Sequence, residues 1–198
     1  INEYGLDPLR YYLLKEVSFG NDGNISKEKL ISCINSDLAN NFGNLCQRVL
    51  AFTEKNLSLK VPDLISFNKE DLSILNNFVE SYEILLNSIN NQNINFYMDF
   101  IVNQMFHANK YFNDQEPWKN KDNVKRLNTI IYTSLELIRK ISILLYPVIP
   151  ESSLKALSIF NIKEETLNIE TIKKNDFLKP NLKLKKIDIL FNKINTKW

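Results

Sequence analysis

Glycine, cysteine and histidine are scarce in this chain of 198 residues, and each shortage excludes a kind of site. The four glycines form neither the GxGxxG nor the GxxxxGK[ST] pattern that holds nucleotide phosphates. Two cysteines, Cys33 and Cys46, are too few for a disulfide framework or a four-cysteine zinc site, so we expect buried, reduced thiols. The single histidine, His107, has no acidic residue or cysteine one helical turn further on, which favours a packed or surface histidine over a ligand or base. The sequence therefore predicts no catalytic residue and no metal site.

Long apolar runs and an excess of one charge are also missing. Hydrophobic residues make up 44% of the chain and charged residues 24%, which are ordinary values for a globular protein. No apolar run approaches the roughly 18 residues of a membrane span, so no membrane partner is expected. Because 25 Lys and Arg face 23 Asp and Glu, a polyanionic partner would have to be held by local contacts and not by a global field.

The chain opens with Ile-Asn-Glu-Tyr and has no initiator methionine. No charged leader, apolar segment or cleavage site follows. We therefore expect a fragment of a longer, cytoplasmic protein.

The first part of the chain is predicted to form two helices. Asp7 followed by Pro8 is typical of a helix start with Asp7 as the N-cap, and turn formers at residues 19–23 end that helix. Ser26 is expected to cap a long helix running to about Lys55, because apolar residues recur there every three or four positions. The opposite face of that helix is expected to carry Asp37, Asn41, Asn44 and Arg48.

Three more helices and a less regular tail are predicted after it. The helices are expected at about 71–88, 95–114 and 124–146. Amphipathic helices joined by short loops make an all-α, antiparallel bundle, in which Pro117 ends the third helix. A short helix is expected at 151–159. Apolar residues then alternate with polar or basic ones at 167–169 and 182–194, which predicts short strands or extended packing segments.

Asn44 and Arg48 are candidate ligand-binding residues because they lie one helical turn apart. Side chains at this spacing project from one face and can reach the same object. Arginine offers planar donors and asparagine a donor and an acceptor, a combination that can recognise the edge of an unpaired base. A solvated polar face explains the same spacing, and periodicity alone favours that interpretation.

Trp118 is a second candidate because it directly follows Pro117 at a predicted helix end, beside Lys119. An indole at such a break can stack on a splayed base, which is worth about 1–3 kcal/mol. Tryptophan is also a common core anchor at the edge of a bundle, and the residues alone favour that interpretation.

Five segments together resemble the bacterial-type methionyl-tRNA synthetase family. Residues 4–14 and 20–26 are similar to the segment after the family's KMSKS loop. Residues 35–48, with the run Asp-Leu-Ala-Asn-Asn-Phe-Gly-Asn-Leu, resemble its first anticodon-domain helix. Residues 111–119 resemble its Y-x-[ND]-x-x-x-P-W signature, and residues 190–194 resemble its closing LFPRI, with Asn-Lys in place of Pro-Arg.

The resemblance implies a class I synthetase fold in two parts. Residues 1–25 would be a remnant of the stem-contact fold, and residues 26–198 an anticodon-binding helical bundle with an extended C-terminal tail. Carried over by motif, Asn44, Arg48 and Trp118 would contact the CAU anticodon loop of methionine tRNA.

The resemblance also implies a division of labour within a longer ligase. The parent protein would use ATP to attach methionine to its tRNA and would pair this bundle with its own catalytic domain. The HIGH, KMSKS and zinc-knuckle segments do not occur in these residues. We therefore expect no cofactor and no activity in this chain alone.

Two alternatives stay open at the level of sequence. Class I synthetases for cysteine, valine, isoleucine or leucine share a helical bundle, although the Pro-Trp signature and the Gly-Asn-Asp-Gly turn argue against them. A helical protein-interaction module that binds a partner helix through the Asn44 face belongs to a different class.

Overall fold

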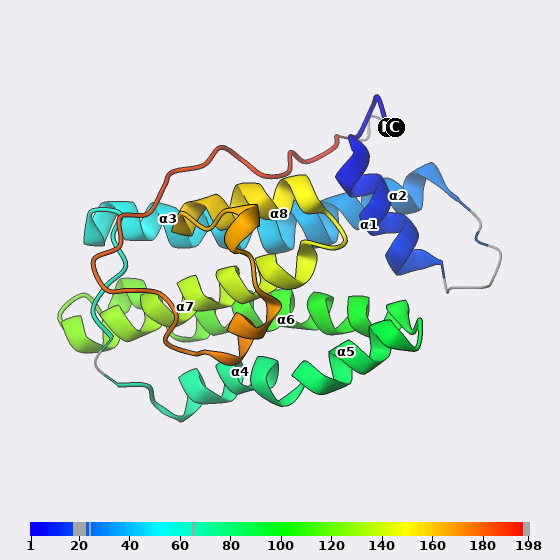
Figure 1. Ribbon diagram of the computed structural model, residues 1–198. Helices are drawn as coiled ribbons and strands as arrows, with labels where there is room; N and C mark the ends of the chain where they lie inside the picture. Colours follow the sequence, from blue (N-terminus) through cyan, green and yellow to red (C-terminus); the bar gives the residue numbers. More distant parts are fainter. Residues whose placement is uncertain (18–22, 24, 65, 196–198) are drawn as a thin grey trace.

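The computed structural model describes residues 1–17, 23, 25–64 and 66–195, and these residues form the predicted all-α fold. The α-helices are α1 (Leu6–Glu16), α2 (Lys27–Cys33), α3 (Asn44–Leu57), α4 (Lys69–Glu80), α5 (Tyr82–Asn90), α6 (Ile94–Asp114), α7 (Val124–Leu145) and α8 (Pro150–Leu157). A π-helical segment, η1 (Ile34–Gly43), joins α2 to α3 in one rod (Figure 1). The turn predicted around Gly20 lies outside the described residues.

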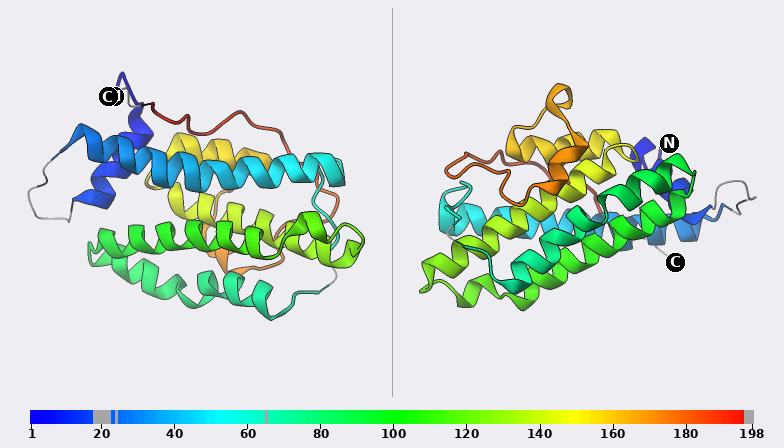
Figure 2. Two further views of the ribbon diagram at one scale, coloured as in Figure 1. Left: turned by 180° about the vertical axis from the view of Figure 1, so that it is seen from behind. Right: turned by 60° about the horizontal axis from the view of Figure 1, so that its bottom comes forward.

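The long helices lie side by side with two directions. Figure 2 shows α6 running antiparallel to both α5 and α7, whereas the α2–η1–α3 rod and α6 run the same way. Cross-helix bonds fix this parallel pair, since Asn109 donates to Asn41 and Arg48 donates to Asn113 further along both helices. The bundle therefore brings the C-terminal part of α3 and the end of α6 to one end of the molecule.

Side-chain caps explain where several helices begin. The Ser26 hydroxyl accepts from the Lys29 N–H, so the predicted cap of α2 is confirmed. Asn68 and Asp71 form a capping box at α4, in which each side chain accepts from the other residue's backbone N–H. Asn123 caps α7 in the simpler way, by accepting from the Arg126 N–H.

α7 is the centre of the fold. Every residue from 129 to 145 is buried, because α6, α4, α3 and α8 pack around this helix and the C-terminal segment covers its remaining face. Its apolar residues, including Leu135, Ile138 and Ile141, are completely buried, as their periodicity predicts.

Two predicted helix limits are wrong. Gly5 and not Asp7 precedes the first helix, and Asp7 instead accepts from the Ser152 N–H at the start of α8 (2.7 Å). This carboxylate thereby satisfies a free N–H of another helix, which a local pattern cannot reveal. The helix predicted at 71–88 is two helices, α4 and α5, with a break at Ser81.

The tail forms no β-strand within the described residues, so the strand alternative is wrong and extended packing segments are found. Short 3₁₀ turns, η4 (Glu164–Thr166) and η5 (Ile169–Lys173), precede an extended path back along the molecule. An isolated antiparallel bridge pairs Lys60 with Lys183. Near the end, the Asn35 amide donates to the Ile194 carbonyl (2.9 Å) and accepts from the Ile194 N–H (2.8 Å).

No helix in the described part of the chain is long and apolar enough to cross a membrane.

Candidate nucleic-acid interface

Asn44, Arg48 and Trp118 come from two places in the fold. Asn44 is the first residue of α3, and Arg48 follows one turn later. Trp118 lies in the 3₁₀ turn η2 (Pro117–Lys119), between the end of α6 and the start of α7. Its side chain is 41% exposed, so the core-anchor interpretation is wrong and the indole is accessible.

Phe112 joins Arg48 to Trp118. This ring is only 2% exposed, and the Trp118 ring meets it edge-on, with a centroid separation of 6.2 Å. The Arg48 guanidinium carbon lies 5.1 Å from the centroid of the same ring, within the range of a cation–π interaction. Arg48 and Trp118 therefore pack against the same phenylalanine ring. The spacing of these residues in the sequence did not reveal this shared contact.

Asn113 fixes the direction of the Arg48 guanidinium. The Arg48 Nη2 donates to the Asn113 Oδ1 at 2.6 Å. A guanidinium carries five N–H donors, so others are left for a ligand. Both Phe112 and Asn113 belong to the signature segment 111–119, and their proximity to the tryptophan in sequence was the available signal.

Asn44 is exposed and lines a groove of about 480 Å³ between the rod and the tail. Its amide forms no hydrogen bond to any other residue that the structure describes. Asn40, Gln47 and the tail residues Asn192 and Lys193 line the same groove. The structure therefore links Arg48 to Trp118 through Phe112 and places Asn44 in an adjoining groove lined by both polar and apolar residues.

The turn that carries Trp118 has an unusual backbone. Glu116 has φ 42° and ψ 61°, in the left-handed region that residues other than glycine rarely adopt. The Asn120 amide donates to the carbonyls of Gln115 (3.0 Å) and Glu116 (3.2 Å), and Pro117 is buried. The turn is thus held by specific bonds and exposes the indole from a fixed base.

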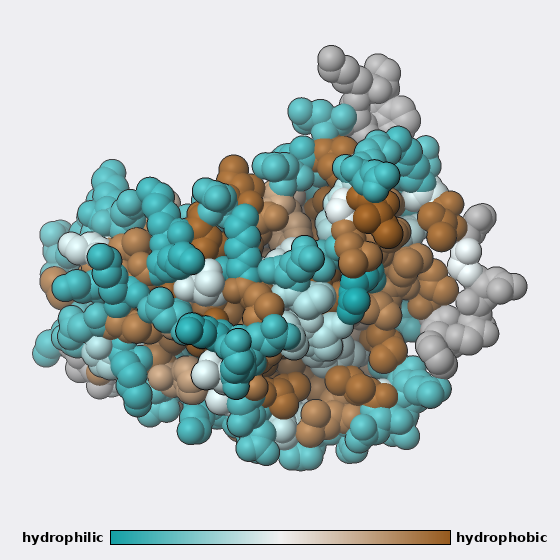
Figure 3. All heavy atoms as spheres, turned by 45° about the horizontal axis from the view of Figure 1, so that its top comes forward, coloured by the Kyte–Doolittle hydropathy of each residue, from teal (hydrophilic) through white to brown (hydrophobic). Residues whose placement is uncertain are grey.

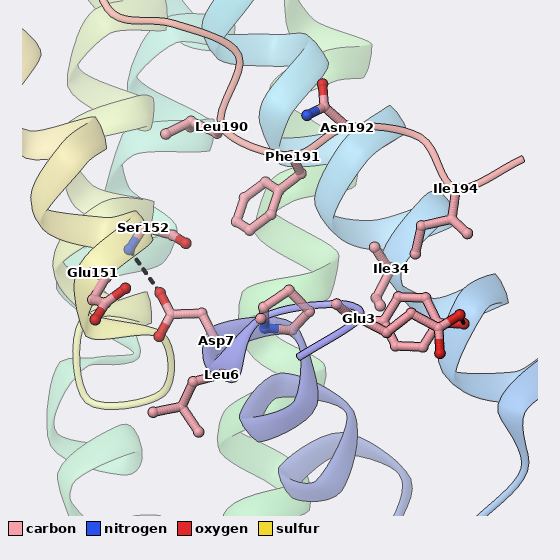
Figure 4. Close-up of a pocket in the computed structure, with 13 residues that line it drawn as sticks. Glu3, Leu6, Asp7, Ile34, Glu151, Ser152, Leu190, Phe191, Asn192 and Ile194 are labelled. Carbon is pink, nitrogen blue, oxygen red and sulfur yellow. Dashed lines mark hydrogen bonds between the residues drawn. The ribbon is translucent and has the colours of Figure 1, made fainter. Parts of the chain in front are cut away.

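Another cavity lies apart from these residues. It measures about 360 Å³ and is bounded by the start of α1, the start of α8 and the tail. Figure 4 shows Phe191 of the tail pointing into it, near the bond between Asp7 and Ser152. None of the three predicted binding residues lines this cavity.

The other reactive residue types are accounted for by structure. Cys33 and Cys46 are free and buried, as predicted. His107 is exposed and stacks edge-on against Phe106, which confirms a surface histidine. Among the described residues, no group of three or more His, Cys, Asp or Glu side chains could hold a metal ion.

Polar residues dominate the end of the molecule where the rod and α6 finish. Figure 3 shows hydrophilic side chains over that end and apolar ones gathered toward the end that carries α1. The exposed apolar residues of α1, α5 and the first turn of α6 include Leu6, Leu13, Ile84, Ile89 and Phe96. Trp118 in η2 and Val124 at the start of α7 are also exposed.

Two family profiles match the chain in succession. The profile described as "tRNA synthetases class I (M)" matches residues 1–50. The profile described as "Anticodon binding domain of methionyl tRNA ligase" matches residues 61–197, which is more than half of the chain.

Individual relatives agree with these profiles. The chain is 36% identical over 170 residues to the methionine–tRNA ligase of Mycobacterium leprae, which covers 83% of this chain and 32% of that protein. It is 32% identical over 199 residues to the methionine–tRNA ligase of Thermotoga maritima, covering 100% of this chain and 32% of that protein. The chain thus spans about a third of the length of these curated relatives.

A solved structure shows the same fold. The crystal structure of the free form of Mycobacterium tuberculosis methionyl-tRNA synthetase superposes with a TM-score of 0.92 at 31% identity. The match covers 99% of this chain and 40% of that chain.

Proposed function

Because this chain belongs to the family of methionyl-tRNA ligase anticodon-binding domains, we propose that it binds the anticodon loop of methionine tRNA and recognises the bases CAU. The observation that carries the proposal is the contact of both Trp118 and Arg48 with the Phe112 ring, which places an accessible indole and an oriented guanidinium on one surface. The match to a methionyl-specific profile supports methionine over the cysteine, valine, isoleucine and leucine alternatives.

Each of the three residues has a distinct role in this proposal. Trp118 stacks on an unpaired nucleobase, because it is exposed to solvent and packs against the buried ring of Phe112. Arg48 donates to a base edge with the N–H groups that Asn113 leaves free. Asn44 supplies a donor and an acceptor to a neighbouring base from the groove beside the tail.

The longer protein would be the ligase. We propose that a catalytic domain outside these residues uses ATP to attach methionine to the tRNA in the cytoplasm, with residues 1–25 as the remnant of the stem-contact fold. The chain alone would make no methionyl-adenylate, since it spans about a third of its relatives. Clear ATP–pyrophosphate exchange by this chain would contradict that division.

Fluorescence anisotropy with a CAU anticodon stem-loop at fixed salt tests the binding residues. Trp118→Ala and Arg48→Ala should each weaken binding by about 1–3 kcal/mol, because each removes one base contact. Trp118→Phe should retain most of the affinity, since phenylalanine still stacks. Arg48→Lys should reduce the preference for CAU, since an ammonium cannot present a planar fork.

Lys110→Ala is the matched control for charge, because Lys110 is an exposed lysine of α6 paired with Asp114. Its loss should leave affinity nearly unchanged. Equal RNA binding by the wild type, Trp118→Ala and Arg48→Ala would contradict the proposal. It would favour a protein-interaction module, in which RNA does not displace the protein partner.

A further inference from the structure

We propose that Asp71 and Arg126 are positioning residues for Trp118, acting through Gln115 to hold the turn that presents the indole. This inference rests on the proposed function, because it assigns the arrangement a purpose in RNA binding. We call Asp71, Arg126 and Gln115 the clamp.

The centre of the clamp is a buried carboxylate. Asp71 is fully buried at the first turn of α4. Its oxygens accept from the Arg126 Nη1 (2.6 Å) and Nη2 (3.0 Å), from the Tyr111 hydroxyl (2.6 Å) and from the Asn68 N–H (2.9 Å). A buried carboxylate is tolerated only when it is paired and hydrogen-bonded, and this one joins α4, α6 and α7 at a single point.

Arg126 carries the clamp to the turn. The same Nη2 that bonds to Asp71 also donates to the Gln115 side-chain oxygen. Gln115 follows the last residue of α6 and directly precedes Glu116, whose backbone is in the left-handed region. The clamp is therefore attached to the turn three residues before Trp118.

The strained backbone of Glu116 gives the clamp its purpose. A left-handed residue other than glycine persists when its surroundings over-determine it, and such residues cluster at functional sites. Bonds from Asn120 hold the backbone of this turn, and the clamp holds the Gln115 side chain. Releasing the clamp would let the turn sample other backbone states, so that Trp118 would be presented correctly for only part of the time.

A second buried carboxylate offers a matched comparison. Asp37 of η1 accepts from the Tyr11 hydroxyl (3.1 Å) and from the Lys15 ammonium (2.7 Å). Its surroundings are thus similar in chemistry to those of Asp71, but Tyr11 and Lys15 lie on α1, and its other partners, Ser36 and Cys33, also lie away from the Trp118 turn. Loss of the Asp37 charge should cost stability without touching Trp118.

The test combines RNA affinity with the fluorescence of Trp118. All variants carry Trp198→Phe, so that Trp118 is the one tryptophan left in the chain. Asp71→Asn and Asp37→Asn are compared for acrylamide quenching of the indole and for binding of the CAU stem-loop. Circular dichroism confirms that each is folded under the conditions used.

We expect Asp71→Asn to raise the quenching constant and to weaken RNA binding about five- to tenfold, because part of the stacking contribution is lost. Asp37→Asn should change neither. Gln115→Ala is the gentler variant, since it leaves the Asp71–Arg126 pair intact and cuts the bond to the turn. It should reproduce the changes in quenching and affinity even where Asp71→Asn fails to fold.

Unchanged quenching and affinity in Gln115→Ala, or equal effects of Asp71→Asn and Asp37→Asn, would overturn the inference. Failure of the proposed function would look different. In that case the wild type would not prefer CAU over another anticodon, while the quenching comparison would still report whether the clamp orients the indole.

Discussion

The two cysteine thiols lie in surroundings that oppose their ionisation. Cys33 is 4% exposed and Cys46 is completely buried. Burial raises the pKa of Cys33 to about 12 and also raises the pKa of Cys46. In the unfolded chain both thiols ionise near their ordinary pKa of about 8.5. Above that pH each thiol keeps its proton in the native state and loses it in the unfolded state, so the thiols' contribution to the free energy of unfolding falls as pH rises.

This linkage predicts a measurable difference between the wild type and the double variant Cys33→Ala/Cys46→Ala. Between pH 8 and 10 the free energy of unfolding of the wild type should fall relative to that of the variant by up to about 1.4 kcal/mol per pH unit for each thiol. Urea unfolding followed by circular dichroism at several pH values measures it. A thiol reagent at pH 8 should label neither cysteine before unfolding and both afterwards. Rapid labelling of the native protein would contradict the burial of these thiols.

Asp37 shows what residue-level reasoning could not foresee. A continuous α-helix would place Asp37 on the face of Asn44 and Arg48, where the sequence predicted it. The intervening η1 segment is π-helical, with i→i+5 bonds that wind fewer degrees per residue. Asp37 therefore turns inward toward Tyr11 and Lys15. Gly43 permits this winding, because a Cβ there would lie 2.9 Å from the Leu38 carbonyl oxygen.

Among the elements, α7 carries the most unusual electrostatics. Glu136 and Arg139 are fully buried and paired, with the Arg139 Nε donating to the Glu136 Oε2 at 2.7 Å. Arg139 also donates to the carbonyls of Thr171 (3.0 Å) and Lys174 (3.2 Å), and Glu136 accepts from the Leu178 N–H (2.7 Å). The pair therefore fastens residues 171–178 of the tail to the central helix.

Neighbouring Lys140 belongs to the same attachment. Its ammonium donates to the Ile172 carbonyl (2.5 Å) and to the Asn175 side-chain oxygen (2.7 Å), and burial lowers its pKa to about 7. The apolar stripe of α7 was predictable from periodicity, but the burial of its charged residues was not. The tail segment that covers these charged residues is irregular and accepts their hydrogen bonds at its backbone carbonyls. A hydrophobic pattern cannot predict such bonds, because every residue has a carbonyl.

Breaking this attachment from one side should be costly. Arg139→Met should lower the free energy of unfolding by about 3–5 kcal/mol, because Glu136 is left buried without its partner. Glu136→Gln/Arg139→Met should cost less than the sum of the two single changes, since the unpaired charge is removed. Urea unfolding of the four proteins measures the coupling. Lys186→Met, which breaks the exposed pair with Glu54, is the control and should cost no more than about 1 kcal/mol.

At the scale of the whole molecule, the sequence predicted the class of fold better than the path of the chain. The 3.6-residue period of apolar side chains predicts long amphipathic helices, so α3, α6 and α7 lie within the expected ranges. The tail follows no period, and its position depends on contacts such as Asn35 with Ile194, which join distant residues. The same limit applies to the site. The family resemblance assigned Asn44, Arg48 and Trp118 to the site, but only the packing of α3 against α6 reveals Phe112 beneath two of them.

The net charge of the molecule predicts how strongly RNA binding depends on salt. The formal charge is +2, so the molecule carries little general attraction for a polyanion. In the proposed interface, stacking on Trp118 and base-edge contacts from Arg48 and Asn44 supply most of the affinity, and few phosphates are neutralised. Each neutralised phosphate on a single strand contributes about −0.7 to the slope of log K against log salt. If only about two phosphates are contacted, raising salt from about 50 to 200 mM should weaken binding less than about tenfold.

Anisotropy titrations of the CAU stem-loop across this range measure the slope. The slope should stay the same in Trp118→Ala, which removes stacking and no charge. A loss of several hundredfold in the wild type would mean that the RNA is held chiefly by its backbone, and would contradict a site built on base contacts.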